Sequence, residues 1–170
     1  MTELAIFAAG CFWGIEEKFL SHHGVLDTEV GYIGGITSDP TYHDVCSGET
    51  GHAEAVRVRF DKDIVNYEEL VSLFFEIHDP TTLNRQGLDI GTQYRSEIFC
   101  LDDDQYLIAD GIKRNFNKEV YDDKIVTSIS MADNFWIAEE YHQKYVRKKK
   151  KYDFLIYDGP VAQLVRAVDS

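Results

Sequence analysis

Hydrophobic and polar residues alternate along this chain with two different spacings. An apolar run over residues 4–9 predicts a short buried strand, and strict alternation over residues 53–60 predicts a strand with one exposed face. Apolar residues three and four apart between residues 66 and 78 predict an amphipathic helix with Asn66 as its N-cap. In chain order the pattern predicts strand 3–9, helix 13–22, strand 25–33, strand 53–60, helix 66–78, strand 95–101, helix 102–117, strand 125–129 and a last helix ending at residue 145.

Two stretches, residues 36–51 and 81–94, lack this periodicity and are punctuated by glycine. Loops of this length inside a compact domain are usually functional or disordered. The first contains Tyr42 and Cys46, and the second contains Asp89. These side chains favour the functional interpretation of both loops.

The order of elements predicts the fold class. Strands alternate with helices, as in an α/β (α+β) two-layer sandwich with a ferredoxin-like split βαβ core. We expect one domain over residues 1–158. Residues 159–170 continue neither a strand nor a helix pattern, so they are predicted to be a non-native or disordered tail.

Composition and charge limit the kinds of binding partner that are expected. The 170 residues are 44% hydrophobic and 13% aromatic, which is typical of an ordered globular protein. A formal net charge of −13 argues against nucleic acid and anionic membranes as partners. The basic run at residues 147–151 is expected to be a solvated surface. The N-terminal apolar run is too short for a signal peptide or a membrane span, so a cytoplasmic protein is expected.

The cysteines and histidines indicate thiol chemistry without a metal. Three cysteines, Cys11, Cys46 and Cys100, have no paired spacing, which argues against a disulfide framework and indicates a reducing compartment. Six scattered histidines show no spacing typical of a metal site. Neither a metal nor an organic cofactor is expected.

Cys11 stands where the first strand gives way to the first helix. Free backbone N–H groups and the helix dipole at this position favour a thiolate, the reactive form of cysteine. The flanking residues Gly10 and Gly14 let the backbone turn tightly. Phe12 and Trp13 next to the thiol are either a wall for an apolar ligand or part of the core, and the pattern alone leaves both interpretations open.

Six sequence segments, taken in order, resemble one known family, the peptide methionine sulfoxide reductases of the A type. The resemblance runs from about residue 6 to residue 145. The segments are Gly10-Cys11-Phe12-Trp13-Gly14, Pro40-Thr41-Tyr42, Gly51-His52-Ala53-Glu54-Ala55-Val56, residues 78–87, Gly91-Thr92-Gln93-Tyr94-Arg95-Ser96 and Glu139-Glu140-Tyr141-His142-Gln143-Lys144-Tyr145.

The resemblance implies catalytic roles for four residues. Cys11 would attack the sulfoxide sulfur and become a sulfenic acid, while Glu54 would protonate the sulfoxide oxygen. Tyr42 and Tyr94 would hydrogen-bond that oxygen. Burial beside apolar rings raises the pKa of a carboxyl group, so Glu54 is expected to be protonated near neutral pH.

The resemblance also implies the substrate and its binding residues. The family acts on the S epimer of methionine sulfoxide. Phe12 and Trp13 would hold the methyl group on the sulfur, and Asp89 would help to hold the substrate. Thioredoxin, or glutaredoxin with glutathione, would be the reductant, and a monomer is expected.

The sequence departs from the family in its cysteines. Many members carry further cysteines near the C-terminus that resolve the sulfenic acid, but none follows Cys100 here. Cys46 and Cys100 are interpreted as packed residues. A one-cysteine cycle is therefore predicted, in which an external thiol reduces Cys11. Leu88, beside Asp89, also makes its loop less polar than the family pattern.

Two other classes of function fit parts of the sequence. Cys11 with His43 or His52 as its base would make a cysteine hydrolase or transferase, although neither histidine has a recognisable orienting partner. A non-catalytic module could instead bind methionine through Phe12 and Trp13. Acyl transfer would proceed without a reductant, whereas sulfoxide reduction requires one for turnover.

Overall fold

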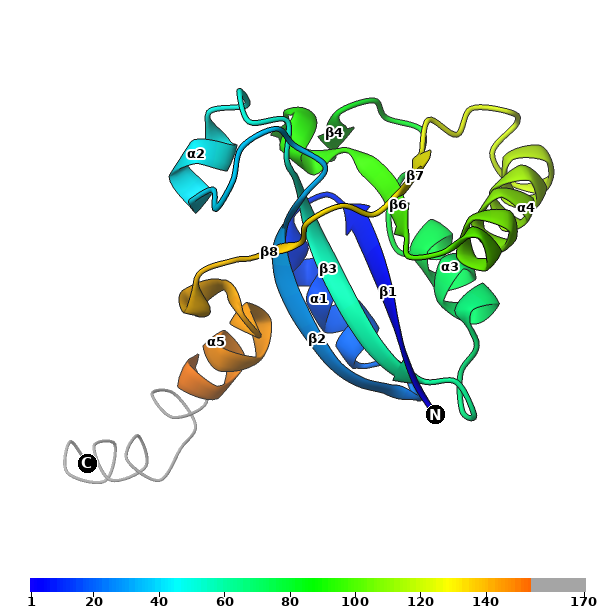
Figure 1. Ribbon diagram of the computed structural model, residues 1–170, viewed down its shortest axis with the longest axis horizontal. Coiled ribbons are helices and arrows are strands. Elements are labelled where there is room, and N and C mark those ends of the chain that lie inside the picture. The colour runs from blue at the N-terminus through cyan, green and yellow to red at the C-terminus, as the bar shows by residue number, and fades with distance from the viewer. Residues whose placement is uncertain (154–170) are drawn as a thin grey trace, which may run out of the picture.

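A computed structural model describes residues 1–153 of the chain (Figure 1). The predicted domain boundary at residue 158 and the predicted tail lie outside this range. The elements are β1 (Thr2–Ala9), α1 (Phe12–Leu20), β2 (Val25–Ile33), α2 (Tyr42–Cys46), β3 (Ala53–Asp61), α3 (Tyr67–Glu76), β4 (Arg85–Gln86), β5 (Asp89–Ile90), β6 (Ser96–Cys100), α4 (Asp103–Glu119), β7 (Ser128–Met131), β8 (Trp136–Ile137) and α5 (Tyr145–Asp153), with short 3-10 helices η1 (Thr92–Tyr94) and η2 (Glu140–His142).

The main sheet has the strand order β7-β6-β1-β3-β2-β8. β3 lies between β1 and β2 and is antiparallel to both, while β1 is also antiparallel to β6. The helices α1 and α3 connect β1 to β2 and β3 towards β6, which gives the split βαβ arrangement. The predicted fold class is confirmed.

Side chains of β1 alternate between two cores. Ala5, Phe7 and Ala9 point into the larger core, whereas Ile6 and Ala8 belong to the smaller one. In Figure 1, α1 lies behind the sheet, on the side of the larger core, and the connection from β7 to β8 crosses in front of it. The two faces of β1 therefore contribute to different cores.

Aromatic stacking joins the helices to the sheet. The ring of Phe7 stacks on Phe19 of α1 with centroids 4.8 Å apart and on Phe74 of α3 at 5.5 Å. Asn66 caps α3 as predicted, because its side chain accepts from the Glu69 N–H while the Glu69 carboxylate accepts from the Asn66 N–H. These contacts fix α1, and with it Cys11, against the sheet.

The last helix is where the sequence prediction is wrong. The helix begins at Tyr145, where it was expected to end, and the preceding residues form β8 and η2. Gln143 explains this, since its side-chain amide bonds the backbone N–H and C=O of Val30 and the C=O of Ala138, each at 2.9 Å. The segment is thus held along the edge of β2, where tertiary hydrogen bonds override its helical pattern.

The two long loops contain short elements that the pattern did not reveal. Residues 36–51 include α2, whose N-terminus has a capping box made by Thr41 and Asp44. Residues 81–94 include the hairpin of β4 and β5 and the 3-10 helix η1. Both loops are therefore ordered structures.

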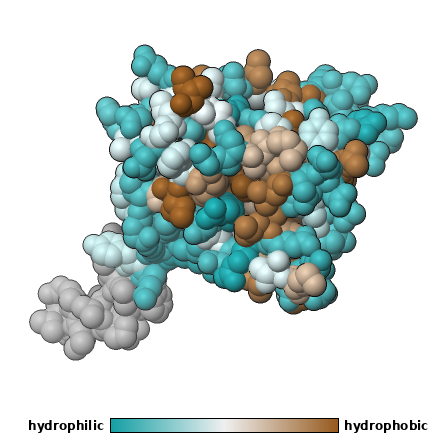
Figure 2. Space-filling view, in the orientation of Figure 1, coloured by the Kyte–Doolittle hydropathy of each residue, from teal (hydrophilic) through white to brown (hydrophobic). Residues whose placement is uncertain are grey.

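Hydrophilic and hydrophobic residues are mixed on the surface. Figure 2 shows the hydrophobic residues of one face gathered mainly near its centre and surrounded by hydrophilic ones. Of the helices within residues 1–153, none is long and apolar enough to cross a membrane.

Candidate active site

Cys11 is the N-cap of α1 and directly follows the tight turn at Gly10. Gly10 has φ 96°, a left-handed conformation that other residues rarely adopt. A Cβ atom at Gly10 would also lie 2.7 Å from the side chain of Gln86 in β4. Glycine therefore allows β1 to turn into α1 while the β4–β5 hairpin packs against the turn.

The Cys11 thiol is partly buried and carries its proton at neutral pH. The pKa of Cys11 is raised to about 11, mainly by burial and to a smaller extent by the nearby carboxyl groups of Glu54 and Asp89. A hydrogen bond from the Trp13 backbone N–H lowers this pKa but does not offset burial. The expectation of a resting thiolate at this helix start is wrong, because desolvation outweighs one N–H donor.

Glu54 lies on β3 with only 2% of its surface exposed. Burial and, to a smaller extent, the charge of Asp89 raise the pKa of Glu54 to about 8, against the opposing effect of the Phe12 N–H, 3.4 Å from Oε1. Glu54 is therefore mostly a neutral acid at pH 7, as expected from its sequence context.

Two tyrosine hydroxyls complete the polar side of the site. Tyr42 is the first residue of α2 and Tyr94 the last of η1, and both are partly buried. Burial and, to a smaller extent, the nearby Glu54 raise the pKa of Tyr94 to about 12. The pKa of Tyr42 is raised by burial and then by a hydrogen bond with Cys46. Both hydroxyls stay neutral and can donate hydrogen bonds.

Cys11 also lines an open pocket of about 250 Å³. Its lining includes Gly14 and Lys18 of α1, Asp89 of β5 and His78 just beyond α3, and Lys18 Nζ donates to the Ile77 C=O at 2.9 Å.

Asp89 is exposed to solvent, and its charge raises the pKa of Cys11, Glu54 and Tyr94. Of the predicted polar residues, Asp89 lines this pocket with Cys11, whereas Tyr42, Glu54 and Tyr94 do not. Glu54 and Tyr94 are near enough to Cys11 to interact with it electrostatically, and Tyr42 interacts in the same way with Glu54 and Tyr94.

The aromatic residues beside Cys11 differ in their exposure. Phe12 is 1% exposed and belongs to the core, whereas Trp13 is only partly buried. The indole N–H of Trp13 donates to Nδ1 of His142 at 2.9 Å, and its ring stacks on Tyr145 at 3.9 Å between centroids. His142 also lies against the rings of Phe12 and Tyr42, at 5.2 and 4.6 Å. These contacts build an aromatic wall next to the thiol.

Comparison with known proteins identifies the family. The family model described as "Peptide methionine sulfoxide reductase" matches residues 3–166. The chain belongs to this family. "Peptide methionine sulfoxide reductase MsrA" of Methanothermobacter thermautotrophicus is 52% identical over 150 residues, which cover 88% of this chain and 89% of the relative.

Solved structures of the family share the fold. The reduced form of Mxr1 from Saccharomyces cerevisiae has a TM-score of 0.84 and 38% identity, covering 88% of this chain and 86% of that chain. Mxr1 in complex with Trx2 has a TM-score of 0.61 and 27% identity, covering 85% of this chain and 84% of that chain.

This reductase family member uses two positioning contacts that sequence reasoning missed. The Glu139 carboxylate accepts from the Tyr42 N–H at 3.1 Å and from the Tyr32 hydroxyl at 3.0 Å, which docks α2 beside the site. His142 holds the Trp13 indole. In the sequence, only the motif at residues 139–145 pointed to Glu139 and His142. Its helical spacing did not indicate which residues these two side chains contact.

The histidine-dependent alternative finds no support at His52. Its Nδ1 accepts from the Gly35 N–H at 3.0 Å, and its Nε2 lies 2.7 Å from the Thr37 C=O. Both ring nitrogens thus hold the loop backbone, and His52 is 2% exposed. His43 is exposed on α2. Within residues 1–153, no group of three or more histidine, cysteine, aspartate or glutamate side chains could hold a metal ion.

All three cysteines are free thiols. Cys100 is buried in β6, with its sulfur 4.0 Å from the Tyr67 hydroxyl, which agrees with its interpretation as a core residue. Cys46 is exposed at the end of α2, so the interpretation of Cys46 as a packed residue is wrong. Its thiol is close enough to Tyr42 to raise the pKa of that hydroxyl.

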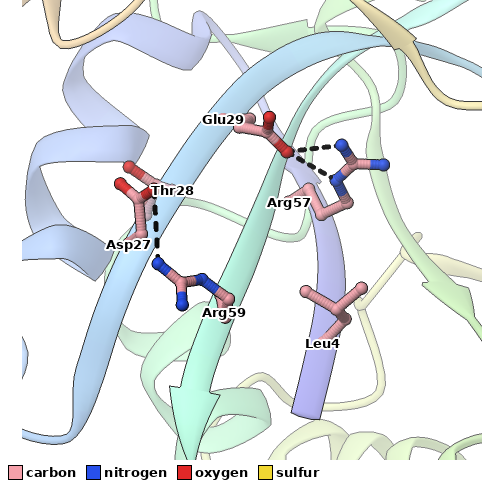
Figure 3. Close-up of a pocket in the computed structure, with 6 residues that line it drawn as sticks. All are labelled: Leu4, Asp27, Thr28, Glu29, Arg57 and Arg59. Carbon is pink, nitrogen blue, oxygen red and sulfur yellow. Dashed lines mark hydrogen bonds and ion pairs between the residues drawn. The ribbon is translucent and has the colours of Figure 1, made fainter. Parts of the chain in front are cut away.

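A separate charged hollow lies on the open face of the sheet (Figure 3). Arg57 pairs with Glu29 across β2 and β3, and Arg59 lies 3.6 Å from Asp27. The cross-strand pairs neutralise one another, and no thiol lines the hollow. We therefore assign the chemistry to the Cys11 pocket.

Proposed function

We propose that this chain reduces the S epimer of methionine sulfoxide, free or within proteins, to methionine, and thereby repairs oxidised proteins. The observation that carries the proposal is a single thiol, Cys11, beside a buried carboxyl group that holds its proton at neutral pH, Glu54. A thiol supplies the electrons, and a neutral acid can protonate the oxygen that leaves sulfur. Family membership supports the same reaction.

In the first half-reaction, Sγ of Cys11 attacks the sulfoxide sulfur. Negative charge develops on the sulfoxide oxygen, and Glu54 donates its proton to that oxygen. The Glu54 carboxylate then takes the proton of the Cys11 thiol, which burial would otherwise keep on sulfur. The protonated oxygen then passes to Sγ, and both the sulfoxide S–O bond and the transient Sγ–S bond break. Two electrons from the thiol thereby reduce the sulfoxide to a thioether, and Cys11 becomes a sulfenic acid.

The remaining predicted site residues bind the substrate in this proposal. Tyr42 and Tyr94 are neutral donors and hydrogen-bond the sulfoxide oxygen. Phe12 and Trp13 directly follow Cys11 and hold the methyl group on sulfur, with Trp13 as the more exposed of the two rings. Asp89 accepts a hydrogen bond from the substrate at the open side of the pocket.

In the second half-reaction, an external thiol reduces the Cys11 sulfenic acid. The first thiol group forms a mixed disulfide with Cys11 and releases water, and a second one frees Cys11 as a thiol and leaves the reductant as a disulfide. The solved complex of the relative Mxr1 with Trx2 supports thioredoxin as this reductant. Glutaredoxin with glutathione is the second candidate. No metal or organic cofactor is required by these steps.

Two further properties complete the proposal. The reaction as written needs the side chains of one chain only, so a monomer is the active form. The sparse, free cysteines fit a reducing compartment, and we infer the cytoplasm as the place of action.

The test is turnover of peptides that contain either the S or the R epimer of methionine sulfoxide. Wild type and Cys11→Ser are compared with thioredoxin or glutaredoxin as the reductant. We expect turnover of the S epimer by the wild type only, and only with a reductant. Acyl transfer without any reductant would favour the cysteine hydrolase instead, and binding without turnover would favour the non-catalytic module.

A further inference from the structure

The β4–β5 hairpin carries Asp89, and its apolar side chains contribute little to holding it in place. Its strands are two residues long, and strands this short are not stable by themselves. Leu88 and Ile90 are 94% and 69% exposed. Polar contacts therefore have to hold the hairpin, and with it the Asp89 carboxylate, against the rest of the protein.

The Gln86 side chain makes these contacts. Its amide oxygen accepts from the Asp79 N–H at 2.9 Å, and its amide nitrogen donates to the Asp79 C=O at 2.8 Å. Its Cβ and Cγ atoms lie against Gly10, because a Cβ atom on that glycine would be only 2.7 Å from each of them. Gln86 thus joins the hairpin both to the loop after α3 and to the turn before Cys11.

The loop that Gln86 grips is itself fixed by the residue before Asp79. Nδ1 of His78 donates to the Phe74 C=O at 2.6 Å, and Nε2 therefore accepts from the Ser96 hydroxyl at 2.7 Å. Burial lowers the pKa of His78 to about 4, so the ring stays neutral and keeps both bonds at neutral pH. The loop is consequently tied to α3 and to β6, and its backbone is a firm anchor for the hairpin.

The register of the hairpin places Asp89 on the same face as Gln86. The two residues pair directly across the turn of Gly87 and Leu88. Side chains directly opposite each other in an antiparallel pair point to the same face, with Cβ atoms about 5 Å apart. Both side chains accordingly line the pocket of Cys11. A displacement of Gln86 would therefore displace Asp89 as well.

We infer that Gln86 is a positioning residue, which holds the Asp89 carboxylate beside the Cys11 thiol through its two hydrogen bonds to the neighbouring loop. Gln86 does not have to touch the substrate for this role. The inference rests on the proposed function, in which Asp89 accepts a hydrogen bond from the substrate. Loss of the Gln86 bonds should weaken substrate binding and leave the chemistry at sulfur unchanged.

The test compares Gln86→Met with Gln105→Met. Methionine keeps the aliphatic part of the side chain but removes both hydrogen bonds. Gln105 in α4 is a matched control on the side of β1 far from the thiol, since its amide also accepts from one backbone N–H, of Leu101 at 3.1 Å, and donates to one C=O, of Leu4 at 2.8 Å. Asp89→Asn and the double variant Gln86→Met/Asp89→Asn complete a double-mutant cycle.

The first readout reports the charge next to Cys11 and needs no sulfoxide. Cys11 is alkylated at one pH with anionic iodoacetate and with neutral iodoacetamide, and mass spectrometry of its peptide gives both rates. The same thiolate attacks both reagents, so the ratio of the rates is independent of the thiolate fraction and reports repulsion by nearby carboxylates. We expect the iodoacetate-to-iodoacetamide ratio to rise about threefold in Gln86→Met and in Asp89→Asn, with no further rise in the double variant.

The second readout is single-turnover methionine formation at increasing concentrations of (S)-methionine sulfoxide. Gln86→Met should require about tenfold more sulfoxide for the half-maximal rate, as expected for the loss of a hydrogen bond to a charged acceptor. Its limiting rate should stay unchanged, because only binding is affected. Gln105→Met should change neither the limiting rate nor the alkylation ratio.

Three results would overturn the inference. An unchanged alkylation ratio in Gln86→Met would show that the hairpin keeps its place without these bonds. A further rise of the ratio in the double variant would show that Gln86 acts on the thiol without Asp89. A lower limiting rate with unchanged half-saturation would exclude a role in binding. A wild type that reduces no sulfoxide would remove the proposed function, whereas the alkylation cycle would still decide whether Gln86 positions Asp89.

Discussion

Cys11 and Glu54 both hold protons at neutral pH, and the proposed chemistry depends on this. Burial raises both pKa values, that of Cys11 to about 11 and that of Glu54 to about 8. A buried thiolate and a buried carboxylate would repel each other. Both would also repel the negative charge that develops on the sulfoxide oxygen. The neutral pair avoids this repulsion, because Glu54 gives its proton to the oxygen as charge develops there and then takes the proton of Cys11.

Substitution of Glu54 tests this arrangement. Glu54→Gln keeps a hydrogen-bond donor and is expected to retain much of the single-turnover rate, whereas Glu54→Ala loses far more, at least tenfold. Because the acid form is lost as pH rises through about 8, the wild-type rate should fall over that range and the Glu54→Gln rate should not. Methionine formation in a single turnover, followed from about pH 6 to pH 10, measures both effects.

Equal losses in the two variants would contradict a role for Glu54 as acid or hydrogen-bond donor. A fall in rate near pH 8 that persists in Glu54→Gln would assign that titration to another group. Either result would leave Cys11 as nucleophile but remove Glu54 from the mechanism.

The sequence suggested candidate residues for the site, but it did not reveal the residues that hold them in place. Cys11, Tyr42, Glu54 and Tyr94 each lie in a short local motif, which one chain shows without a structure. Glu139 bonds Tyr42, 97 residues away, and His142 bonds Trp13, 129 residues away. No periodicity encodes contacts over such separations.

At the scale of elements, the segment from β8 to η2 holds the site together. It pairs with β2, docks α2 through Glu139 and positions Trp13 through His142. Its helical spacing of apolar residues predicted a helix, but backbone pairing with Val30 decides its structure. The elements α2, β4 and β5 were missed because they are five or two residues long, too short for a period to show.

Gln143→Ala tests how strongly this segment is anchored. The substitution removes three hydrogen bonds to backbone groups, two of them on Val30, which is 0% exposed. Because buried groups lose their partners, we expect the free energy of unfolding to fall by about 2–4 kcal/mol. Urea denaturation measures it, with Glu140→Ala on the exposed side of η2 as the control, expected to change it by less than about 0.5 kcal/mol. If Gln143→Ala lowers the free energy of unfolding by as little as Glu140→Ala, the pairing of β8 with β2 alone anchors the segment.

At the scale of the whole molecule, the split βαβ core was predictable because it follows from the order of strands and helices. The edges of the sheet were not, since β8 joins β2 and β7 joins β6 through pairings distant in sequence. The exposure of Cys46 was also missed, because it depends on α2. Because Cys46 is exposed, the one-cysteine cycle has to be tested with the other two cysteines replaced.

The double variant Cys46→Ser/Cys100→Ser tests that cycle. If an external thiol reduces Cys11 directly, the variant should keep steady-state turnover with thioredoxin within about twofold of the wild type. Cys46 is exposed and Cys100 is core, so thermal unfolding serves as the control for any packing loss at Cys100. A stable Cys11–Cys46 or Cys11–Cys100 disulfide in the wild type, found by mass spectrometry after one equivalent of substrate, would defeat the one-cysteine cycle.

The central claim, that Cys11 takes the oxygen of the substrate, has one direct measurement. Reduced protein is mixed with excess (S)-methionine sulfoxide without any reductant, and both methionine and the modification of each cysteine are quantified by mass spectrometry. The account predicts one methionine per chain, one added oxygen atom on Cys11 and no methionine from Cys11→Ser. Methionine formed by Cys11→Ser, or methionine from the wild type with Cys11 unmodified, would contradict it.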